Sequence, residues 1–411
     1  MNLFRSFRRW STDMGRVFRN EWSLVLGDVG VILFFFILPL AYPIVYTLIY
    51  NPEVVEKMPV AIVDNCRSAE SREFAFKADA CPAIKVYSFP SDMAEARSQM
   101  AAGDIFGIIE IPSSYARDLA TGQQTHIQFY AEMSLLLRYR SFLSALTDLQ
   151  MELVGERTAE KIEGHGLGSL AVSGMPVKSH SNFLGDTEQG FASFVIPGIV
   201  ILILQQSMIL GINMICGTSR ERRRRNGGID PKAVNGVSAS ATVWGKTLCY
   251  LVCYIPVTLY ILRFIPEIFN LPHYGSPADY LLFIFPMLLA SAFLGQTLNY
   301  FMKERESAFI IIVFTSVVFL FLSGLTWPRY AMSPLWLALG DLVPGVWGVE
   351  GFIRINSNAA SLAETATAFK AMWILAAVYM LSAFWVTAYI DAREKRRATE
   401  HAVETDKIAT H

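Results

Sequence analysis

The sequence predicts an α-helical polytopic membrane protein with about six transmembrane helices and an inserted α/β extracytoplasmic domain between helices 1 and 2. Two observations predict this class. Of the 411 residues, 53% are hydrophobic and only 17% are charged, which is respectively above and below the averages of soluble domains. The apolar residues are also concentrated in six runs, each long enough to cross a hydrocarbon core of roughly 30 Å.

The first run covers residues 29–50 and reads VGVILFFFILPLAYPIVYTLIY. At about 1.5 Å per residue, a helix of this length reaches roughly 33 Å and can span the membrane. The run begins too far into the chain for a cleaved signal h-region, and no small-residue cleavage site follows it. The other five predicted spans are residues 191–216, 247–265, 280–301, 308–327 and 371–390.

Residues 1–28 precede the first span and mix aromatic residues with arginines. Their spacing places Phe7, Trp10 and Phe18 on one helical face and the arginines on another. Such a pattern is typical of an amphipathic helix that lies in the membrane interface. A disordered basic tail is the alternative interpretation.

Residues 51–190 form the polar part of the chain, where short β-rich runs alternate with helical patterns. This alternation is typical of a small α/β sheet. The predicted strands are residues 59–63, 84–87, 105–111 and 125–130. The predicted helices are residues 69–78, 92–101, 113–119 and 135–162, followed by a Gly- and Ser-rich linker. A disulfide between Cys66 and Cys81 is left open, for the case of an oxidising compartment.

The distribution of Lys and Arg predicts the orientation, because cationic segments are retained in the cytoplasm. The connections on the N-terminal side of the membrane, together with both termini, hold nineteen Lys and Arg residues. The short connections on the opposite side hold four, namely Arg263, Arg329, Arg354 and Lys370. Both termini, including the tail 391–411, are therefore predicted to be cytoplasmic. The basic loop 217–246 is interpreted as a headgroup anchor or a docking surface for a cytoplasmic partner.

The segment 328–370 between the last two spans is apolar but interrupted by Asp341, Pro344 and several glycines. A carboxylate and an interior proline both penalise a helix exposed to lipid. Two re-entrant half-helices that dip in from the extracytoplasmic face are expected here instead.

The chain carries no motif expected of an enzyme. The run Trp244-Gly245-Lys246-Thr247 resembles the end of a P-loop, but Ser240 stands where the first glycine belongs and a span follows. The six histidines have no i, i+4 pairing and no cysteine at metal spacing. No catalytic residue, metal ligand or cofactor is therefore predicted in this chain, and no nucleic-acid partner is expected. The net charge of −1 hides the asymmetry of Lys and Arg between the two sides and carries no information about nucleic acid.

Polar residues within spans are costly in lipid and point either to interhelical hydrogen bonds or to a substrate path. No span carries an acidic residue in its middle, which disfavours a proton-driven antiporter. The polar span residues are Gln205, Gln206 and Asn213 in the second span, Gln296 and Asn299 in the fourth, and Thr315 and Ser316 in the fifth.

The order of several short motifs resembles the membrane subunits of ABC-2-type exporters of the long-periplasmic-loop subgroup. The motifs are Leu322-Ser323-Gly324, Trp327-Pro328, Met332, Pro334 and Pro344 after the fifth span, and Pro197-Gly198 and Arg220-Glu221-Arg222 around the second. Glu21, Asp28 and Pro39 match the N-terminal pattern more loosely. Two departures are Gly27, where the family has an arginine paired with the aspartate, and Gly227-Gly228-Ile229 after the basic run.

The resemblance implies a permease subunit of an ATP-driven exporter of amphiphilic small molecules or lipids in a bacterial inner membrane. It also implies a dimer with a second copy or a paralogue, and a separate cytoplasmic ATPase subunit that binds ATP and Mg. Membrane lipids, a periplasmic adaptor and an outer-membrane channel are further expected partners. The implied ATPase contacts are Arg220, Glu221, Arg222, Arg223, Arg224 and Glu21. The implied translocation path residues are Gln205, Gln206, Asn213, Thr315 and Ser316.

Two other functions stay open at this point. A membrane-anchored receptor would use the extracytoplasmic domain for recognition, and a proton-driven secondary transporter would need no ATPase. The sequence names no cargo, because a lipid, a drug and a peptide all tolerate apolar walls with a few amides.

Overall fold

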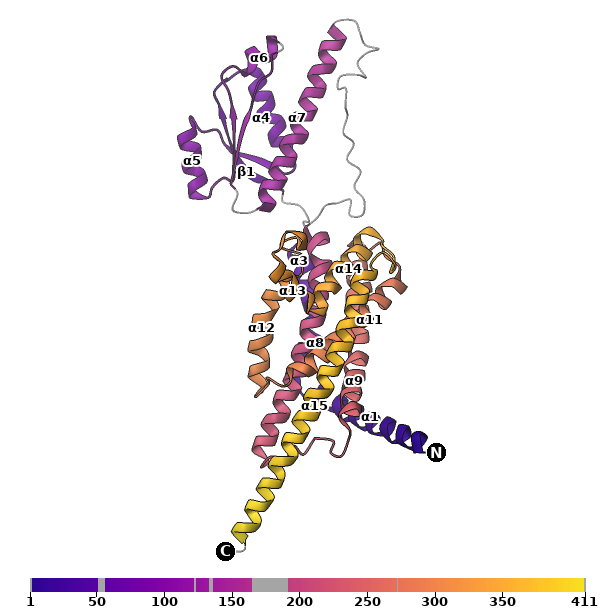
Figure 1. Cartoon of the computed structure of the whole chain (residues 1–411). Coiled ribbons are helices and arrows are strands. Elements are labelled where there is room, and N and C mark those ends of the chain that lie inside the picture. The colour runs from indigo at the N-terminus through magenta and orange to yellow at the C-terminus, as the bar shows by residue number, and fades with distance from the viewer. Residues whose placement is uncertain are drawn as a thin grey trace. The chain divides into compact units, whose positions relative to one another are not determined.

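The chain divides into two compact units (Figure 1). The computed structural model describes residues 2–50, 56–121, 123–132, 136–164, 191–271 and 273–409. One unit comprises residues 1–51 and 183–411 and contains the apolar helices. The other comprises residues 52–182 and contains the sheet.

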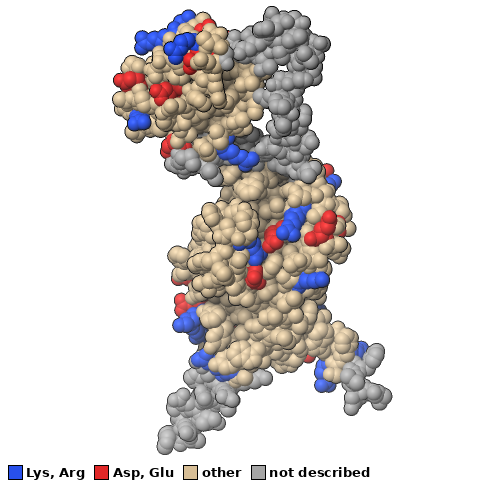
Figure 2. All heavy atoms as spheres, turned by 45° about the horizontal axis from the view of Figure 1, so that its top comes forward, with Lys and Arg blue, Asp and Glu red and all other residues tan. Residues whose placement is uncertain are grey.

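Six helical segments in the described residues are long and apolar enough to cross a membrane, which confirms the predicted number. Three segments are single helices: α8 (Phe191–Arg225), α11 (Pro277–Leu298) and α12 (Arg305–Leu322). The first span joins α2 (Val29–Ile32), η1 (Leu33–Ile37) and α3 (Leu38–Ile49). The third joins α9 (Ala239–Leu259), η3 (Tyr260–Phe264) and α10 (Ile265–Ile268), and the last lies in α15 (Ala366–Ala409). The visible face of this unit is largely uncharged (Figure 2).

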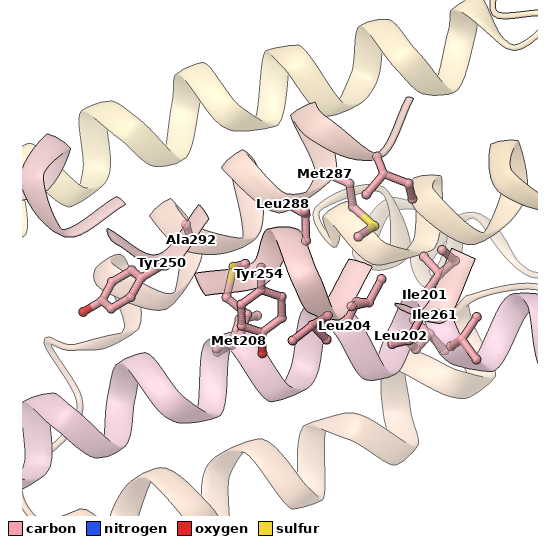
Figure 3. Packing of buried hydrophobic residues seen from close by; sticks show 14 of the residues in the cluster. Ile201, Leu202, Leu204, Met208, Tyr250, Tyr254, Ile261, Met287, Leu288 and Ala292 are labelled. Carbon is pink, nitrogen blue, oxygen red and sulfur yellow. The ribbon is translucent and has the colours of Figure 1, made fainter. Parts of the chain in front are cut away.

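Helix α8 forms the centre of the membrane unit. Its most apolar window is 78% buried, against 17% for α12 and 22% for the first span. Leu204 and Met208 of α8 pack with Tyr254 of α9 in one continuous core (Figure 3). The Tyr254 hydroxyl lies 2.8 Å from the Ser207 hydroxyl, and its ring meets the Phe35 ring edge-on with centroids 4.8 Å apart. These contacts hold the first and third spans against α8, whereas α12 presents most of its surface outward.

Residues 2–26 form a single helix, α1 (Asn2–Leu26). Figure 1 shows it running outward from the end of the bundle at which α8 and α15 also project. It packs on the start of α9, where the Trp10 indole donates a hydrogen bond of 3.1 Å to Ser240 Oγ. Ser238 caps α9 by accepting from the Ala241 N–H, so this helix begins eight residues before the predicted span.

The segment between the last two spans forms η4 (Arg329–Ala331), α13 (Pro334–Asp341) and α14 (Pro344–Asn358). Neither α13 nor α14 is among the candidate spans of the described residues, and their insertion into the membrane as re-entrant half-helices stays a prediction. Val349, Phe352 and Ile355 of α14 join the core around α8. The Arg329 guanidinium pairs with Asp341 and with Glu350 at 2.8 Å, and it stacks on Trp347 at 4.6 Å from the ring centroid.

The second unit contains a four-stranded sheet in the order β2-β1-β3-β4. Its strands are β1 (Met58–Asp64), β2 (Ile84–Ser88), β3 (Gly107–Ile111) and β4 (Gln128–Ala131). β1 runs parallel to β2 and β3, and β4 runs antiparallel to β3. The helices are α4 (Ala69–Ala80), α5 (Met93–Ala102), α6 (Tyr115–Thr121) and α7 (Leu136–Gly164). Alternating strand residues point to opposite faces of the sheet and form a hydrophobic core on each. One core packs against α4 and α7, and the other packs against α5.

The two cysteines of this unit are free in the structure, so the disulfide left open by the sequence is not formed in it. Cys66 and Cys81 are both partly buried against the same core of the sheet. Burial raises the pKa of the Cys81 thiol, and the nearby carboxylates of Glu152 and Asp148 raise it further.

Candidate functional site

The last turn of α8 holds the connection between α11 and α12 in place. The Arg220 guanidinium donates to the Asn299 carbonyl at 2.7 Å and to the Met302 carbonyl. These carbonyls lie just past the C-terminal end of α11, where helices leave such acceptors unsatisfied. Arg224 pairs with Glu304 at 2.6 Å. The basic end of α8 therefore fixes the connection to the chain itself.

Asp28 and Arg305 link the start of the first span to the start of α12. Asp28 caps α2 by accepting from the N–H groups of Gly30 and Val31, and it pairs with Arg305 at 2.7 Å. The Arg305 N–H donates to Glu221 of α8 at 2.8 Å. The expected arginine beside Asp28 is absent because residue 27 is glycine, and Arg305 supplies the cation instead.

Asp230 holds the loop that follows α8 and was not predicted as a site residue. Its carboxylate, which is only 4% exposed, pairs with Arg222 at 3.2 and 3.3 Å. It also accepts from the Ser219 hydroxyl and, at 3.0 Å, from the Lys232 N–H. Burial by itself raises the pKa of Asp230, but these hydrogen bonds outweigh it and hold that pKa below its ordinary value.

The lowered pKa of Asp230 predicts a pH-dependent loop. A carboxyl whose pKa is lower in the folded chain stabilises it above the unfolded pKa of about 3.9 and loses this effect as the pH falls through the folded value. We therefore expect the loop around Asp230 to open on acidification below about pH 4. Hydrogen exchange of residues 226–233, read by mass spectrometry, measures this opening. The Asp230→Asn variant should show little protection relative to the intrinsic exchange rate at every pH, and a protection profile equal to that of the wild type would contradict the prediction.

Glu21 lies inside the membrane unit, which corrects its assignment as an ATPase contact. Its side chain is 1% exposed. It accepts a hydrogen bond from the Tyr250 hydroxyl and pairs with Lys246 at 3.4 Å, both on α9. A carboxylate in the core needs such partners, because an unpaired buried charge is strongly unfavourable. Glu21 thus fastens α1 to α9 and has no surface left for a partner protein.

The arginines of the basic run differ in whether their guanidinium groups are engaged within the chain or exposed to solvent. Arg220 and Glu221 are engaged with the α11–α12 connection, Arg222 with Asp230, and Arg223 donates to the Gly228 carbonyl at 2.7 Å. The Arg224 side chain is 59% exposed. Arg225, which the sequence-based set omitted, is exposed and makes no ion pair or hydrogen bond within the described ranges. Exposure therefore favours Arg224 and Arg225 as groups open to a partner.

Among the described residues, no hydrogen bond joins the expected path residues to one another. On α8, the fully buried Gln205 accepts a hydrogen bond from the Gly345 N–H at the start of α14. Asn213 donates to the Ile209 carbonyl of its own helix at 2.7 Å. On α12, Thr315 and Ser316 donate to the carbonyls of Ile311 and Val313. Within the described residues, the amide nitrogen and oxygen of Gln206 have no hydrogen-bond partner, although both are shielded from solvent.

The two neighbouring glutamines are predicted to differ in effect. Gln205→Leu leaves the Gly345 N–H without its acceptor, so we expect a loss of about 1–2 kcal/mol in the free energy of unfolding. Gln206→Leu removes no hydrogen bond, so its stability should change by less than about 0.5 kcal/mol. Unfolding in mixed detergent micelles measures both. Equal losses in the two variants would show that Gln205 does not hold α14.

The fold and these contacts define a multi-pass membrane protein whose buried polar groups fasten its spans to one another. A sequence model of the ABC-2 family transporter proteins matches residues 30–385, which is most of the chain. The protein belongs to the ABC-2 transporter family. Members of this family are membrane transport subunits that normally partner with an ATPase subunit. No curated protein matches the chain.

Proposed function

We propose that this chain is the permease subunit of an ATP-driven exporter that moves amphiphilic small molecules or lipids out of the cytoplasm or the inner leaflet. A separate ATPase subunit would bind ATP and Mg. The bilayer would be a bacterial inner membrane, with both termini in the cytoplasm and residues 52–182 outside it. A second copy or a paralogue would complete a dimer, and an adaptor and an outer-membrane channel are the expected extracytoplasmic partners.

The contact between the end of α8 and two other spans carries this proposal. At about 1.5 Å per residue, the 35 residues of α8 reach roughly 52 Å, well beyond a hydrocarbon core of roughly 30 Å. Its last turn contacts Arg305 of α12, which in turn pairs with Asp28 of the first span. A force applied by an ATPase at Arg224 and Arg225 would therefore reach three spans through packed side chains and ion pairs.

Gln206 supports a substrate path along α8. An amide without a hydrogen-bond partner is costly away from water, at roughly 1–3 kcal/mol. Val195, Ile199, Ile203 and Gln206 are partly exposed and follow each other at helical spacing, so they form one stripe on α8, whose other residues from 196 to 207 are buried. A passing cargo with a hydroxyl or carbonyl group would satisfy this amide on a wall that is otherwise apolar.

Copurification tests the proposal. The tagged full-length chain is purified from its native host, its partners are identified by mass spectrometry, and ATP hydrolysis is measured. An ATPase with a P-loop should copurify with the wild type. The amount of ATPase that copurifies with the Arg224→Glu, Arg225→Glu double variant should be at least about tenfold lower, because like charges at an interface cost several kcal/mol.

Lys370→Glu is the matched control, because this exposed lysine lies on α15 at the other end of the spans. It should recover as much ATPase as the wild type. A folded wild-type sample that brings down no ATPase would contradict the proposal and favour a receptor or a proton-driven transporter.

A further inference from the structure

A cavity of about 210 Å³ lies beside the junction between α1 and the first span. Ser23 and Leu24 of α1 line one side, Thr218 and Arg222 of α8 line another, and Lys232 of the following loop completes it. A single water needs roughly 15 Å³ of such space, so the cavity has room for a polar group of several atoms.

The cavity carries hydrogen-bond donors that the chain leaves unused. The Lys232 ammonium group has no ion pair among the described residues, and the Ser23 hydroxyl has no hydrogen bond there. Arg222 donates its Nε and Nη2 hydrogens to Asp230, and in the described part of the chain its Nη1 makes no hydrogen bond. A group with several oxygen acceptors and a negative charge would match these three donors, as phosphate does.

One carboxylate also lines the cavity, and its charge is already compensated. Asp28 pairs with Arg305 at 2.7 Å and accepts from two backbone N–H groups. Asp230, which faces Arg222 from the loop, is neutralised by that arginine. The Lys232 charge is therefore left over, and the cavity as a whole favours an anion.

The position of the cavity points to a lipid as the source of the phosphate. It lies where α1 ends at Leu26 and the candidate first span begins at Val29. Since the hydrocarbon-spanning part of a helix is flanked on each side by the headgroup region, this junction corresponds to the depth of the headgroups. Leu24 and Ile215 give it an apolar side that glycerol and the start of an acyl chain can cover. Lys and Arg at this depth attract anionic lipids. We propose that this cavity binds the headgroup phosphate of an acidic phospholipid, from the leaflet in which α1 lies, as a resident lipid between α1 and α8.

Native mass spectrometry of the full-length protein tests the proposal. The protein is stripped of lipid in detergent and titrated with phosphatidylglycerol or with phosphatidylcholine. We expect the wild type to retain phosphatidylglycerol in preference. Lys232→Gln should weaken this binding about fivefold, since one surface lysine contributes about 1 kcal/mol to the attraction of anionic lipid. Ser23→Leu, which changes no charge, should weaken it by filling the cavity.

Lys303→Gln is the matched control, because Lys303 is an exposed lysine on the α11–α12 connection and does not line the cavity. It should bind lipid as the wild type does. Equal phosphatidylglycerol retention in all four proteins would overturn the proposal. Binding of inorganic phosphate by the wild type, without preferential retention of phosphatidylglycerol, would overturn its lipid part and assign the cavity to free phosphate. Both outcomes leave the permease role untouched, because ATPase recovery is measured separately.

Discussion

Replacing Glu21 with glutamine is expected to lower the free energy of unfolding by about 2–4 kcal/mol, since it removes one partner of a buried ion pair. Glutamine keeps the size of the side chain, so the loss is one of charge. Lys246 would then face the core without an anion, while its 27% exposed side chain keeps the penalty below that of a fully buried cation. Unfolding in mixed micelles measures the change.

A second substitution separates the ion pair from simple packing. Adding Lys246→Met to Glu21→Gln removes both charges and leaves an amide oxygen as acceptor for Tyr250, so no uncompensated charge stays in the core. The double variant should therefore regain most of the lost stability. Glu304→Gln serves as the exposed control, because the Arg224–Glu304 pair lies at the surface and should contribute less than about 1 kcal/mol. If Glu21→Gln costs no more than Glu304→Gln, the contact with Lys246 does not form in the folded protein.

The spans were predictable because lipid allows few alternatives. A backbone in hydrocarbon must satisfy its own hydrogen bonds, so each long apolar run has to be a helix. The ends were less predictable. α8 continues nine residues past the predicted end at 216, because five of its last eight residues are arginines, which are good helix formers, and no proline or glycine follows Gly217 before Arg225. α12 ends at Leu322, five residues before the predicted end, where Gly324 takes a positive φ of 90° and Pro328 follows.

The small sheet was predictable in outline from alternation, but its strand ends were not. The run 105–111 was predicted as one strand, whereas β3 covers Gly107–Ile111. The Phe106 N–H and carbonyl still bond to Pro59 and Glu132, so pairing continues just outside the strand. Such shifts follow from the partner strands, which a single run does not reveal.

Most contacts of the candidate site could not be predicted from the sequence. Asp28 and Arg305 are 277 positions apart, and Gln205 and Gly345 are 140 apart. Only the packing of whole helices brings such pairs together. The basic run after the second span was visible, but which of its arginines face inward depends on where α11 ends. One signal was available and unused: Asp230 is the first acidic residue after five arginines and a natural partner for them.

The Gly217→Ala substitution should cause the second large loss of stability, because Gly217 lies where α8 contacts the start of α12. A Cβ at this position would lie 2.6 Å from the Arg305 nitrogen, 2.7 Å from its Cα and 2.7 Å from the Glu304 carbonyl carbon. These are backbone atoms, so no side-chain rotation relieves the overlap. Overpacking of this kind costs about 1–3 kcal/mol, and here it also moves Arg305 away from Asp28 and Glu221.

Gly15→Ala is the matched control, because Gly15 lies in α1 and a Cβ there would meet nothing within 4 Å. The same exchange should stabilise that helix by about 0.5–1 kcal/mol, so the two variants are expected to differ in sign. Unfolding in micelles measures both. Hydrogen exchange at residues 305–308 should also rise in Gly217→Ala, because the Arg305 N–H loses its acceptor on Glu221. Unchanged exchange there, with stability as high as in Gly15→Ala, would mean that α8 and α12 do not touch at Gly217, and the proposed transmission from α8 to α12 would lose its structural basis.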